Sequence, residues 1–537
     1  MKLVAILQLD PMDLDLILTY NINNMKKIIK NYLKIKTKIF PLLLVIMFLA
    51  SCSKYLDINT DPDSVTDNPG IYLLPSIEIS IGSIVGGQLA LHGSLWAQYY
   101  NQNNTANQYR TIIDMQLQAD DGDVPWNELY PNALSDLKKL KEYSDMPQNY
   151  NPRLKLIATV LESYTYQVIF DCFGQAPYTE AIKGESDGNF TPVFDNGSDV
   201  YPKLIKAIDD AIVELNTFYA ENPSAPINLR ADFATQDYLL AGDMAAWIAF
   251  ANSVKLKIAM RNLDFDPSGS RTVISALEAE NNYLDQDIML DIFRPEVLKE
   301  NPLYASDQNL NTTINLVANR TLSEFLTTNG DPREPLMFQS NTAGNLLLDH
   351  GDHRSTTASH PEYSNRTLIW DATRPVYFIT TSEINFFRAE LVVKGIITGD
   401  AKEFYDAAVD QAFTRVGASS AGFLGTGEYY EFRSNGTLEE KMEDIGVQKW
   451  AAMANVNPYE GFLEMNRLDY PEILQTMTYV SPQPTGNAGA KLYLPKNTVL
   501  ASNYIKRYLL PESERTSNSV NFPTQTVVTD RLWWDTH

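Results

Sequence analysis

The chain has 537 residues, of which 44% are hydrophobic, and it carries a formal net charge of −24 at pH 7. Nucleic-acid-binding proteins present a basic patch, so this acidic balance argues against a nucleic-acid partner. The length exceeds that of a usual single core, so we expect one large domain with subregions, or two lobes.

The first predicted element is a signal peptide. Six lysines between positions 26 and 38 precede an apolar run over residues 41–50, which leads through small residues to Cys52. This order is typical of a bacterial lipoprotein, so we predict that translation starts at Met25, that residues 1–51 are removed, and that Cys52 carries the lipid. The apolar run is shorter than the roughly 20 residues that span a bilayer, so we expect attachment by the lipid anchor alone.

After the cysteine we predict an extended tether and then the folded domain. Residues 52–68 are rich in Asp, Asn, Ser, Thr and Pro, whereas residues 69–537 show helical periodicity. Asn151-Pro152 predicts a helix start, because a capping residue precedes a proline at the first helical position. An apolar stripe over residues 240–258, with steps of four and three, predicts a thin central helix.

One segment indicates how the helices are arranged. The pattern A-x3-Y-x2-A over residues 401–408 fits the second helix of a tetratricopeptide unit, and Gly395 lies where the preceding helix should turn. Residues 262–380 and 416–537 are instead dense in Asn, Thr, Gly, Pro and aromatic residues, and such long loops are usually functional. The predicted fold class is mainly α: a scaffold of tetratricopeptide-like helix pairs with a large, irregular, loop-rich subregion.

The sequence lacks common catalytic signatures. There is no H-E-x-x-H, no G-x-S-x-G, no phosphate-binding G-x-x-x-x-G-K-[ST] and no C-x-x-C. With Cys52 assigned to the lipid, Cys172 has no partner, and a free cysteine is most often a small buried hydrophobic residue. The absence of these motifs does not exclude an enzyme. A surface hydrolase that uses two carboxylates stays open as an alternative.

A histidine cluster could bind a metal. His350 and His353, with Asp349, Asp352 and His360, provide nitrogen and oxygen donors that zinc accepts. The surrounding Gly, Ser and Thr residues are typical of a mobile loop without a rigid frame. We therefore predict no metal site.

An aromatic segment that runs into amides is the candidate binding site. Aromatic faces stack on the C–H faces of sugars, and side-chain amides hydrogen-bond to their hydroxyls. The candidate ligand-binding residues are Trp96, Tyr99, Tyr100, Asn101, Asn103 and Asn104. The alternative is that Trp96 and Tyr99 are core residues at helical spacing. The sequence does not place Tyr304 or Trp370 relative to this segment.

Several blocks in order along the chain carry a resemblance. The first two blocks after Cys52 are YLDINTDP at residues 55–62 and FDCFGQAPYTEA at residues 170–181. The later blocks lie within residues 242–262, 390–395 and 448–450, and the last is RLWWD at residues 531–535. From Cys52 onward the chain resembles the SusD/RagB family of nutrient-uptake outer-membrane lipoproteins. One departure is Asn466-Arg467, where the family often has paired arginines.

The resemblance implies a fold of tetratricopeptide-like helix pairs and a non-enzymatic function. Such proteins lie on the extracellular face of the outer membrane, bind an oligosaccharide and deliver it to a TonB-dependent, SusC-like transporter. Some members bind calcium, which nothing in this sequence indicates, so we expect no cofactor. A tryptophan and an asparagine of the family's first aromatic segment often contact the ligand, and Trp96 and Asn101 match that position. Capture of peptides by the same fold is the alternative function.

Overall fold

The computed structural model describes residues 24–27, 30, 70–310, 313–339, 347–355 and 366–537. The chain divides into two compact units, Met1–Asn68 and Pro69–His537. Only five residues of the first unit are described, so the predicted lipid-attachment residue Cys52 and the tether lie outside the described residues. All other described residues belong to the second unit.

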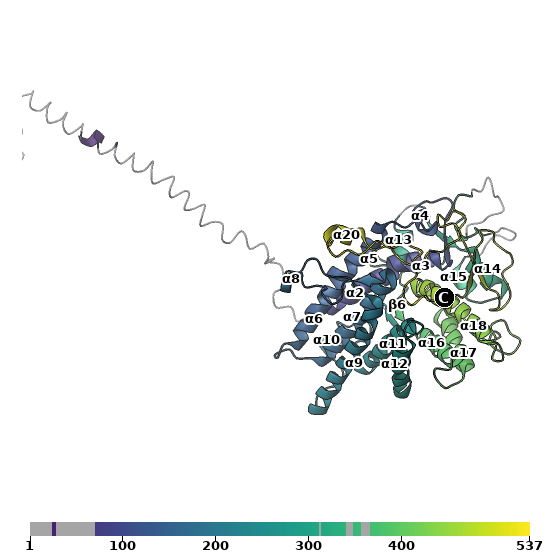
Figure 1. Ribbon diagram of the computed structural model, residues 1–537, viewed down its shortest axis with the longest axis horizontal. Coiled ribbons are helices and arrows are strands. Elements are labelled where there is room, and N and C mark those ends of the chain that lie inside the picture. The colour runs from purple at the N-terminus through teal and green to yellow at the C-terminus, as the bar shows by residue number, and fades with distance from the viewer. Residues whose placement is uncertain (1–23, 28–29, 31–69, 311–312, 340–346, 356–365) are drawn as a thin grey trace, which may run out of the picture. The chain divides into compact units, whose positions relative to one another are not determined.

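Helices that follow one another in the sequence pack side by side (Figure 1). The main packed helices are α6 (Ser135–Asp145) with α7 (Pro152–Phe173), α7 with α9 (Gly197–Glu221), α11 (Met244–Asn262) with α12 (Pro267–Glu280), α16 (Thr381–Val393) with α17 (Ala401–Arg415), and α18 (Leu438–Met453) with α19 (Pro458–Leu468). The prediction of a mainly α scaffold of helix pairs is confirmed.

The ends of these helices follow from local chemistry. Pro152 is the first residue of α7, as predicted. Asp243 caps α11, because its carboxylate accepts the backbone N–H groups of Ala245 and Ala246. Gly395 adopts φ +65° directly after α16, a left-handed conformation that ends the helix where the sequence predicted its turn.

The first described segment of this unit runs through the core. It comprises η1 (Gly70–Leu73), α2 (Leu74–Ile84), a π-helical turn η2 (Val85–Leu89) and α3 (Ala90–Trp96). By length and composition Gly70–Trp96 could cross a membrane, but 67% of its most apolar window is buried inside the protein. A Cβ at Gly93 would collide with the backbone of Tyr459, so glycine lets α3 and α19 approach backbone to backbone.

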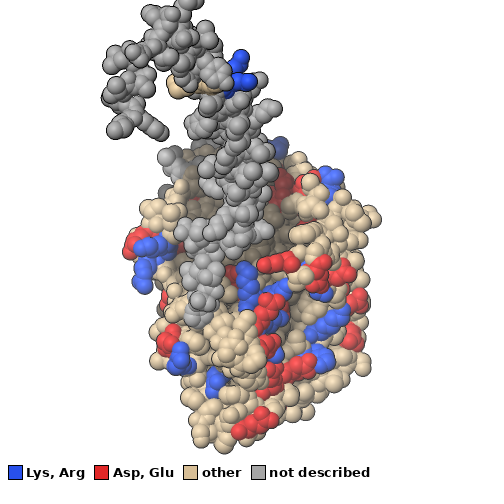
Figure 2. All heavy atoms as spheres, turned by 90° about the vertical axis from the view of Figure 1, so that its left-hand side faces the viewer, with Lys and Arg blue, Asp and Glu red and all other residues tan. Residues whose placement is uncertain are grey.

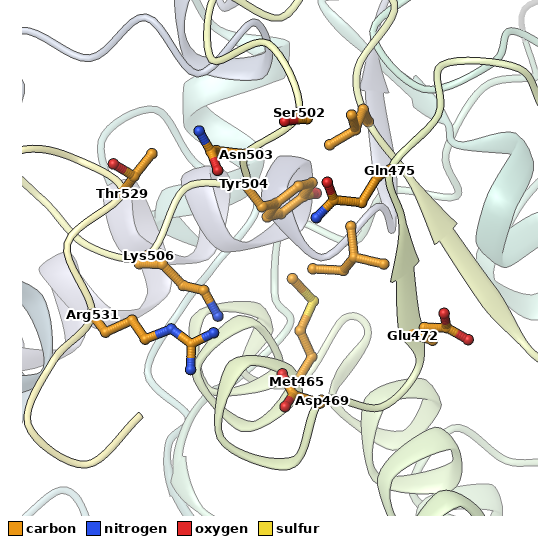
Figure 3. A pocket seen from close by; sticks show the side chains of 12 residues that line it. Met465, Asp469, Glu472, Gln475, Ser502, Asn503, Tyr504, Lys506, Thr529 and Arg531 are labelled. Carbon is orange, nitrogen blue, oxygen red and sulfur yellow. The ribbon is translucent and has the colours of Figure 1, made fainter. Parts of the chain in front are cut away.

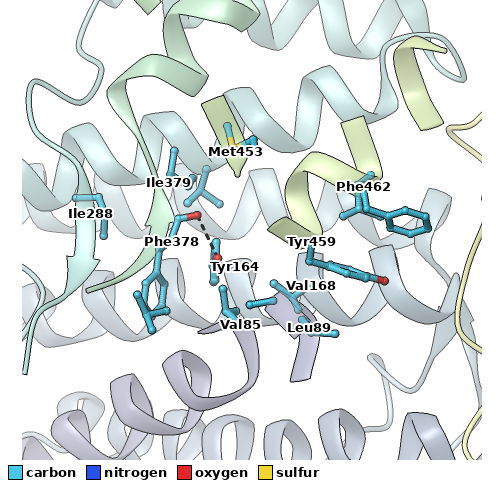
Figure 4. Close-up of a cluster of buried hydrophobic side chains, with 14 of the residues drawn as sticks. Val85, Leu89, Tyr164, Val168, Ile288, Phe378, Ile379, Met453, Tyr459 and Phe462 are labelled. Carbon is cyan, nitrogen blue, oxygen red and sulfur yellow. Dashed lines mark hydrogen bonds between the residues drawn. The ribbon is translucent and has the colours of Figure 1, made fainter. Parts of the chain in front are cut away.

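The core joins elements that are far apart in the sequence (Figure 4). Val85 and Leu89 of η2 lie beside Tyr164 and Val168 of α7. The Tyr164 hydroxyl donates a hydrogen bond of 3.2 Å to the backbone carbonyl of Phe378, which lies in β6 (Val376–Ile379). The buried tyrosine hydroxyl is thereby paired, as a buried polar group requires.

The remaining elements are short. Four two-stranded sheets are described: β1 (Tyr100–Gln102) with β5 (Leu316–Ala318), β2 (Gln175–Ala176) with β3 (Asp195–Asn196), β4 (Ile288–Leu290) with β6, all antiparallel, and the parallel pair β7 (Glu472–Leu474) with β8 (Lys491–Tyr493). The short helices are α4 (Arg110–Ile113), η3 (Ala119–Gly122), α5 (Asp123–Glu128), η4 (Leu129–Leu134), α8 (Gly184–Asp187), α10 (Ala231–Ala234), α13 (Pro302–Gln308), α14 (Arg320–Thr328), α15 (Glu334–Met337) and α20 (Glu512–Ser517).

The expectation of loops over residues 416–537 needs correction, because α18 and α19 lie within that range. Both helices carry charged side chains on their buried faces, and these interrupt the apolar period that sequence analysis follows. Lys449 of α18 and Glu464 of α19, for example, pair at 2.7 Å and are at most 2% exposed.

These two residues belong to a buried ion network that joins α7, α11, α16, α18 and α19. Its members are Asp171, Lys257, Arg261, Glu383, Glu390, Lys394, Lys449, Glu460, Glu464 and Arg467. Burial alone would raise the pKa of Glu390, but Arg467 and Lys394 lower it to about 2. Cations and carboxylates balance within the network, which makes burial of so many charges tolerable.

Candidate functional site

The structure places Trp96, the centre of the predicted sugar platform, in the interior. Its side chain is 0% exposed, and Nε1 donates a 3.0 Å hydrogen bond to the carbonyl of Ile112. The ring packs among His92, Phe462 and Tyr508, with centroid separations of 5.1–5.4 Å. No face of Trp96 is open to a sugar. Trp96 is therefore a core residue, which is the alternative that the sequence leaves open.

The next three candidates are also interior. The Tyr99 hydroxyl donates to the carbonyl of Trp450 at 2.6 Å, and Tyr100 is 2% exposed. Asn101 donates from Nδ2 to the carbonyl of Asp349 at 2.8 Å and accepts the N–H of Gly351 at 3.2 Å. The expected exposed amide turn at Asn101 is instead an internal clamp that holds the segment around residue 350.

The last two candidates lie nearer the surface. Asn103 is 8% exposed and donates to the carbonyl of Ile314 at 2.9 Å. Asn104 is half-buried and donates to the carbonyl of Ser355 at 2.7 Å. Of the six predicted contacts, Asn104 therefore has the most solvent-accessible side chain.

The histidine segment is packed and ion-paired between residues 349 and 353, rather than forming the mobile loop that we expected. Asn319 Nδ2 donates a 2.9 Å hydrogen bond to His350 Nδ1, and His353 Nε2 contacts Asp114 Oδ1 at 2.8 Å. Burial lowers the pKa of His350 to about 3, so its imidazole is neutral. Within the described ranges, no three His, Cys, Asp or Glu side chains come together as a metal site, and His360 lies outside those ranges.

Two aromatic residues that the sequence could not place meet beside β1. Trp370 contacts the ring of Tyr100 and the ring of Tyr304, each at a centroid separation of 6.2 Å. Tyr304 and Trp370 are half-buried, and the neighbouring Ile369 is 37% exposed. We call the surface formed by the two aromatic residues Tyr304 and Trp370, together with the adjoining Ile369, the aromatic surface.

Hydrogen bonds fix the backbone under the aromatic surface. The Asn301 N–H donates to the carbonyl of Ala372, and its Nδ2 donates to the carbonyl of Arg374, both at 2.8 Å. The Asn301 side chain also caps α13, which carries Tyr304. Asn301 thus holds α13 and the segment that follows Trp370 in one arrangement, which pre-organises the two rings.

The structure also contains a pocket of about 300 Å³ (Figure 3). Tyr504 lines it, and its hydroxyl bonds to the carbonyl of Trp96. Gln475, Ser502, Asn503 and Thr529 add amides and hydroxyls to the lining, while Asp469, Glu472, Lys506 and Arg531 add both signs of charge. Sequence analysis missed this pocket because its residues are spread over segments of no shared pattern.

Charge on the outer surface is mixed. On the face shown in Figure 2, described Lys and Arg side chains lie interspersed with Asp and Glu rather than gathered in one basic patch. This distribution agrees with the acidic composition and gives a nucleic acid no continuous electrostatic footprint on that face.

The fold first defines a class: a mainly α protein built on packed helix pairs, in which aromatic side chains are held half-buried near the surface. Within that class, a family described as "Starch-binding associating with outer membrane" (SusD-like) matches residues 65–486 by its sequence model. The chain belongs to this SusD-like family. The family is one of glycan-binding, outer-membrane-associated proteins rather than enzymes.

Solved structures share the fold. A Bacteroidetes SusD-like protein is 19% identical with a TM-score of 0.67, over 87% of this chain and 100% of that one. A SusD homolog from Bacteroides uniformis is 20% identical, with a TM-score of 0.68 over 87% and 100%. A chitin-binding SusD homolog from Flavobacterium johnsoniae is 18% identical, with a TM-score of 0.66 over 86% and 97%. No curated protein matches the sequence.

Proposed function

We propose that this protein is a surface lipoprotein that captures an oligosaccharide and delivers it to a TonB-dependent, SusC-like transporter in the outer membrane. Membership of the SusD-like family supports the glycan-binding part of this function. Attachment through a lipid on Cys52, and a position on the extracellular face, rest on the signal-peptide pattern of the sequence. We propose binding without turnover and without a cofactor.

The observation that carries the proposal is the aromatic surface. Trp370 and Tyr304 meet edge to face at 89° and remain accessible, whereas Trp96, Tyr99 and Tyr100 do not. A sugar ring gains its binding energy by covering an aromatic face, so the half-buried Trp370 is the better contact. Gln308, the last residue of α13, and Asn309, which follows it, are amides on the segment that carries Tyr304, and amides can hydrogen-bond to sugar hydroxyls.

Chitin is a reasonable first ligand to test, because two of the structural neighbours are named as chitin-binding. The aromatic surface does not by itself distinguish chitin from other polymers, since every pyranose offers a C–H face. A broad set of plant, host and microbial oligosaccharides is therefore needed, with peptides in the same screen.

The experiment is a binding screen of the chain from Ser53 onward, with product analysis and with EDTA in a parallel arm. The proposal expects saturable glycan binding, no shortened sugars and no effect of EDTA. Retention of peptides but no glycans would favour the peptide alternative, and released sugars would favour a hydrolase. Tyr304→Ala should weaken the glycan binding, whereas Tyr238→Ala, which changes a 42% exposed tyrosine on another segment, should leave it unchanged.

A further inference from the structure

A second cavity, of about 610 Å³, lies between the N-terminus of α9 and the C-terminal segment. Gly174 and Gln175 line it from the end of α7 and β2, Ser198 from the first turn of α9, and Thr526 and Trp533 from the C-terminal segment. It is separate from the aromatic surface, since no residue of that surface lines it.

Arg507 lines this cavity as a buried cation that lacks a counter-ion. The side chain is 6% exposed and forms no ion pair with the described residues, although the charge of Asp530 acts on it. Nε donates a 3.3 Å bond to the carbonyl of Tyr508, and Nη2 has no hydrogen-bond partner in the described part of the chain. An unpaired buried charge is costly, so an anion that pairs with it is favoured.

The guanidinium lies close to the backbone at Gly174. A Cβ at this position would come within 3.0 Å of both Nη1 and Nη2, and the residue has φ +72°. Glycine therefore makes room for the arginine head group at the edge of the cavity.

Other donors surround the same space. The Thr526 hydroxyl is buried and has no partner among the described residues. The 25-residue helix α9 begins at this cavity, so the positive end of its dipole lies there, although the Gly197 N–H is already bonded to the carbonyl of Gly174 at 2.9 Å. Trp533 adds an aromatic side chain that is half-buried.

Two nearby carboxylates oppose an anion but are otherwise engaged. Asp530 accepts the N–H of Val527 at 2.8 Å, and Asp199 of α9 accepts from Asn196 at 3.3 Å. Burial lowers the pKa of Arg507 to about 10, although Asp530 raises it, so the guanidinium stays charged at neutral pH.

We propose that this cavity binds the carboxylate of an acidic sugar, with Arg507 and Thr526 on the carboxylate and Trp533 beside the sugar ring. The inference deepens the proposed glycan-binding function by adding a charged-sugar site to the aromatic surface. The two sites can be tested separately, because no residue of the aromatic surface lines this cavity.

The test is calorimetry of the full chain in detergent with galacturonate, and with galactose and acetate as comparators. We expect galacturonate to bind at least tenfold more tightly than either comparator. Arg507→Gln should lower its affinity at least tenfold, Arg507→Lys should recover part of this loss, and Thr526→Val should lower it about threefold. Arg230→Gln, at an exposed arginine that does not line the cavity, should leave the galacturonate affinity unchanged.

If galactose binds as tightly as galacturonate, the proposal that the cavity recognises a carboxylate is wrong. If acetate binds as tightly as galacturonate, the proposal that the cavity recognises the sugar ring is wrong. Undiminished galacturonate binding by an Arg507→Gln protein with an unchanged melting temperature would overturn the role of Arg507. If that variant does not fold, the comparators and Thr526→Val, which removes a hydroxyl without a structural partner among the described residues, decide the outcome.

Discussion

Arg467 of α19 and Glu390 of α16 form a two-bonded ion pair in the interior of the protein. Nη1 donates to Oε1 at 2.8 Å and Nη2 to Oε2 at 2.6 Å, and both side chains are 1% exposed. Arg467 also donates to Glu464, one turn earlier on α19. The pair links one helix pair, α16 with α17, to the next, α18 with α19.

Arg467→Met should therefore lower the free energy of unfolding by about 3–5 kcal/mol, because it leaves Glu390 and Glu464 buried with less compensation. Denaturant titration measures the change. The matched control is Lys206→Met, which breaks an exposed pair with Asp210 and should cost about 1 kcal/mol or less. Equal losses from the two variants would contradict a stabilising role for the buried pair.

Trp96→Ala should act on stability rather than on binding. Removal of a fully buried indole leaves a cavity among His92, Phe462 and Tyr508, which should cost about 3–5 kcal/mol of unfolding free energy. The glycan affinity of the protein that remains folded should not change. A variant with wild-type stability and weaker glycan binding would instead show that Trp96 contacts the ligand.

The stability of the protein should fall in acid. Burial lowers the pKa of both His92 and His350 to about 3, below the ordinary value of 6.5. Between about pH 6.5 and pH 3, the two histidines therefore bind protons in the unfolded chain but stay neutral in the folded protein. The free energy of unfolding consequently decreases as the pH falls through this range. Glu390, with a pKa of about 2 against 4.5, adds a further loss below pH 4.5.

Denaturant titrations between pH 8 and pH 4 measure this dependence. Each histidine contributes a slope of up to about 1.4 kcal/mol per pH unit. His350→Asn should remove part of the slope between pH 6.5 and 4.5. A free energy of unfolding that stays constant over this window would show that the two imidazoles titrate normally in the folded protein.

Cys52→Ala should remove the lipid and with it the membrane attachment, leaving the protein soluble or retained by its uncut signal peptide. Cys172→Ala is the matched control, because Cys172 is buried within α7 and cannot be the lipid site. Fractionation of cells and mass spectrometry of the mature N-terminus measure the outcome. Lipid on the Cys52→Ala protein would contradict the anchor.

Much of the scaffold could be predicted because its signals are local. Pro152, Asp243 and Gly395 set helix ends through their own backbone and side-chain chemistry. The helices α18 and α19 could not be predicted in this way. Lys449 and Arg467 read as surface charges until their partners, which come from other helices, are known.

The candidate site likewise has a part that the local sequence predicted and a part that depends on contacts between distant segments. The sequence identified an aromatic and amide segment but could not tell its buried part from its exposed part. Tyr100 is covered because β1 pairs with β5, more than 200 residues later, and because Trp370 packs on its ring. The accessible aromatic surface is thus formed by contacts between segments that are distant in the sequence, and no spacing of residues along the chain predicts it.

The most direct test of glycan capture by the aromatic surface is the calorimetric affinity of the wild type and of Trp370→Ala for the best oligosaccharide from the screen. We predict saturable binding by both folded proteins that is weakened by about 1–3 kcal/mol in the variant, the scale of losing an aromatic contact in a binding site. Equal affinities for the two proteins would contradict the assignment of the aromatic surface as the glycan site.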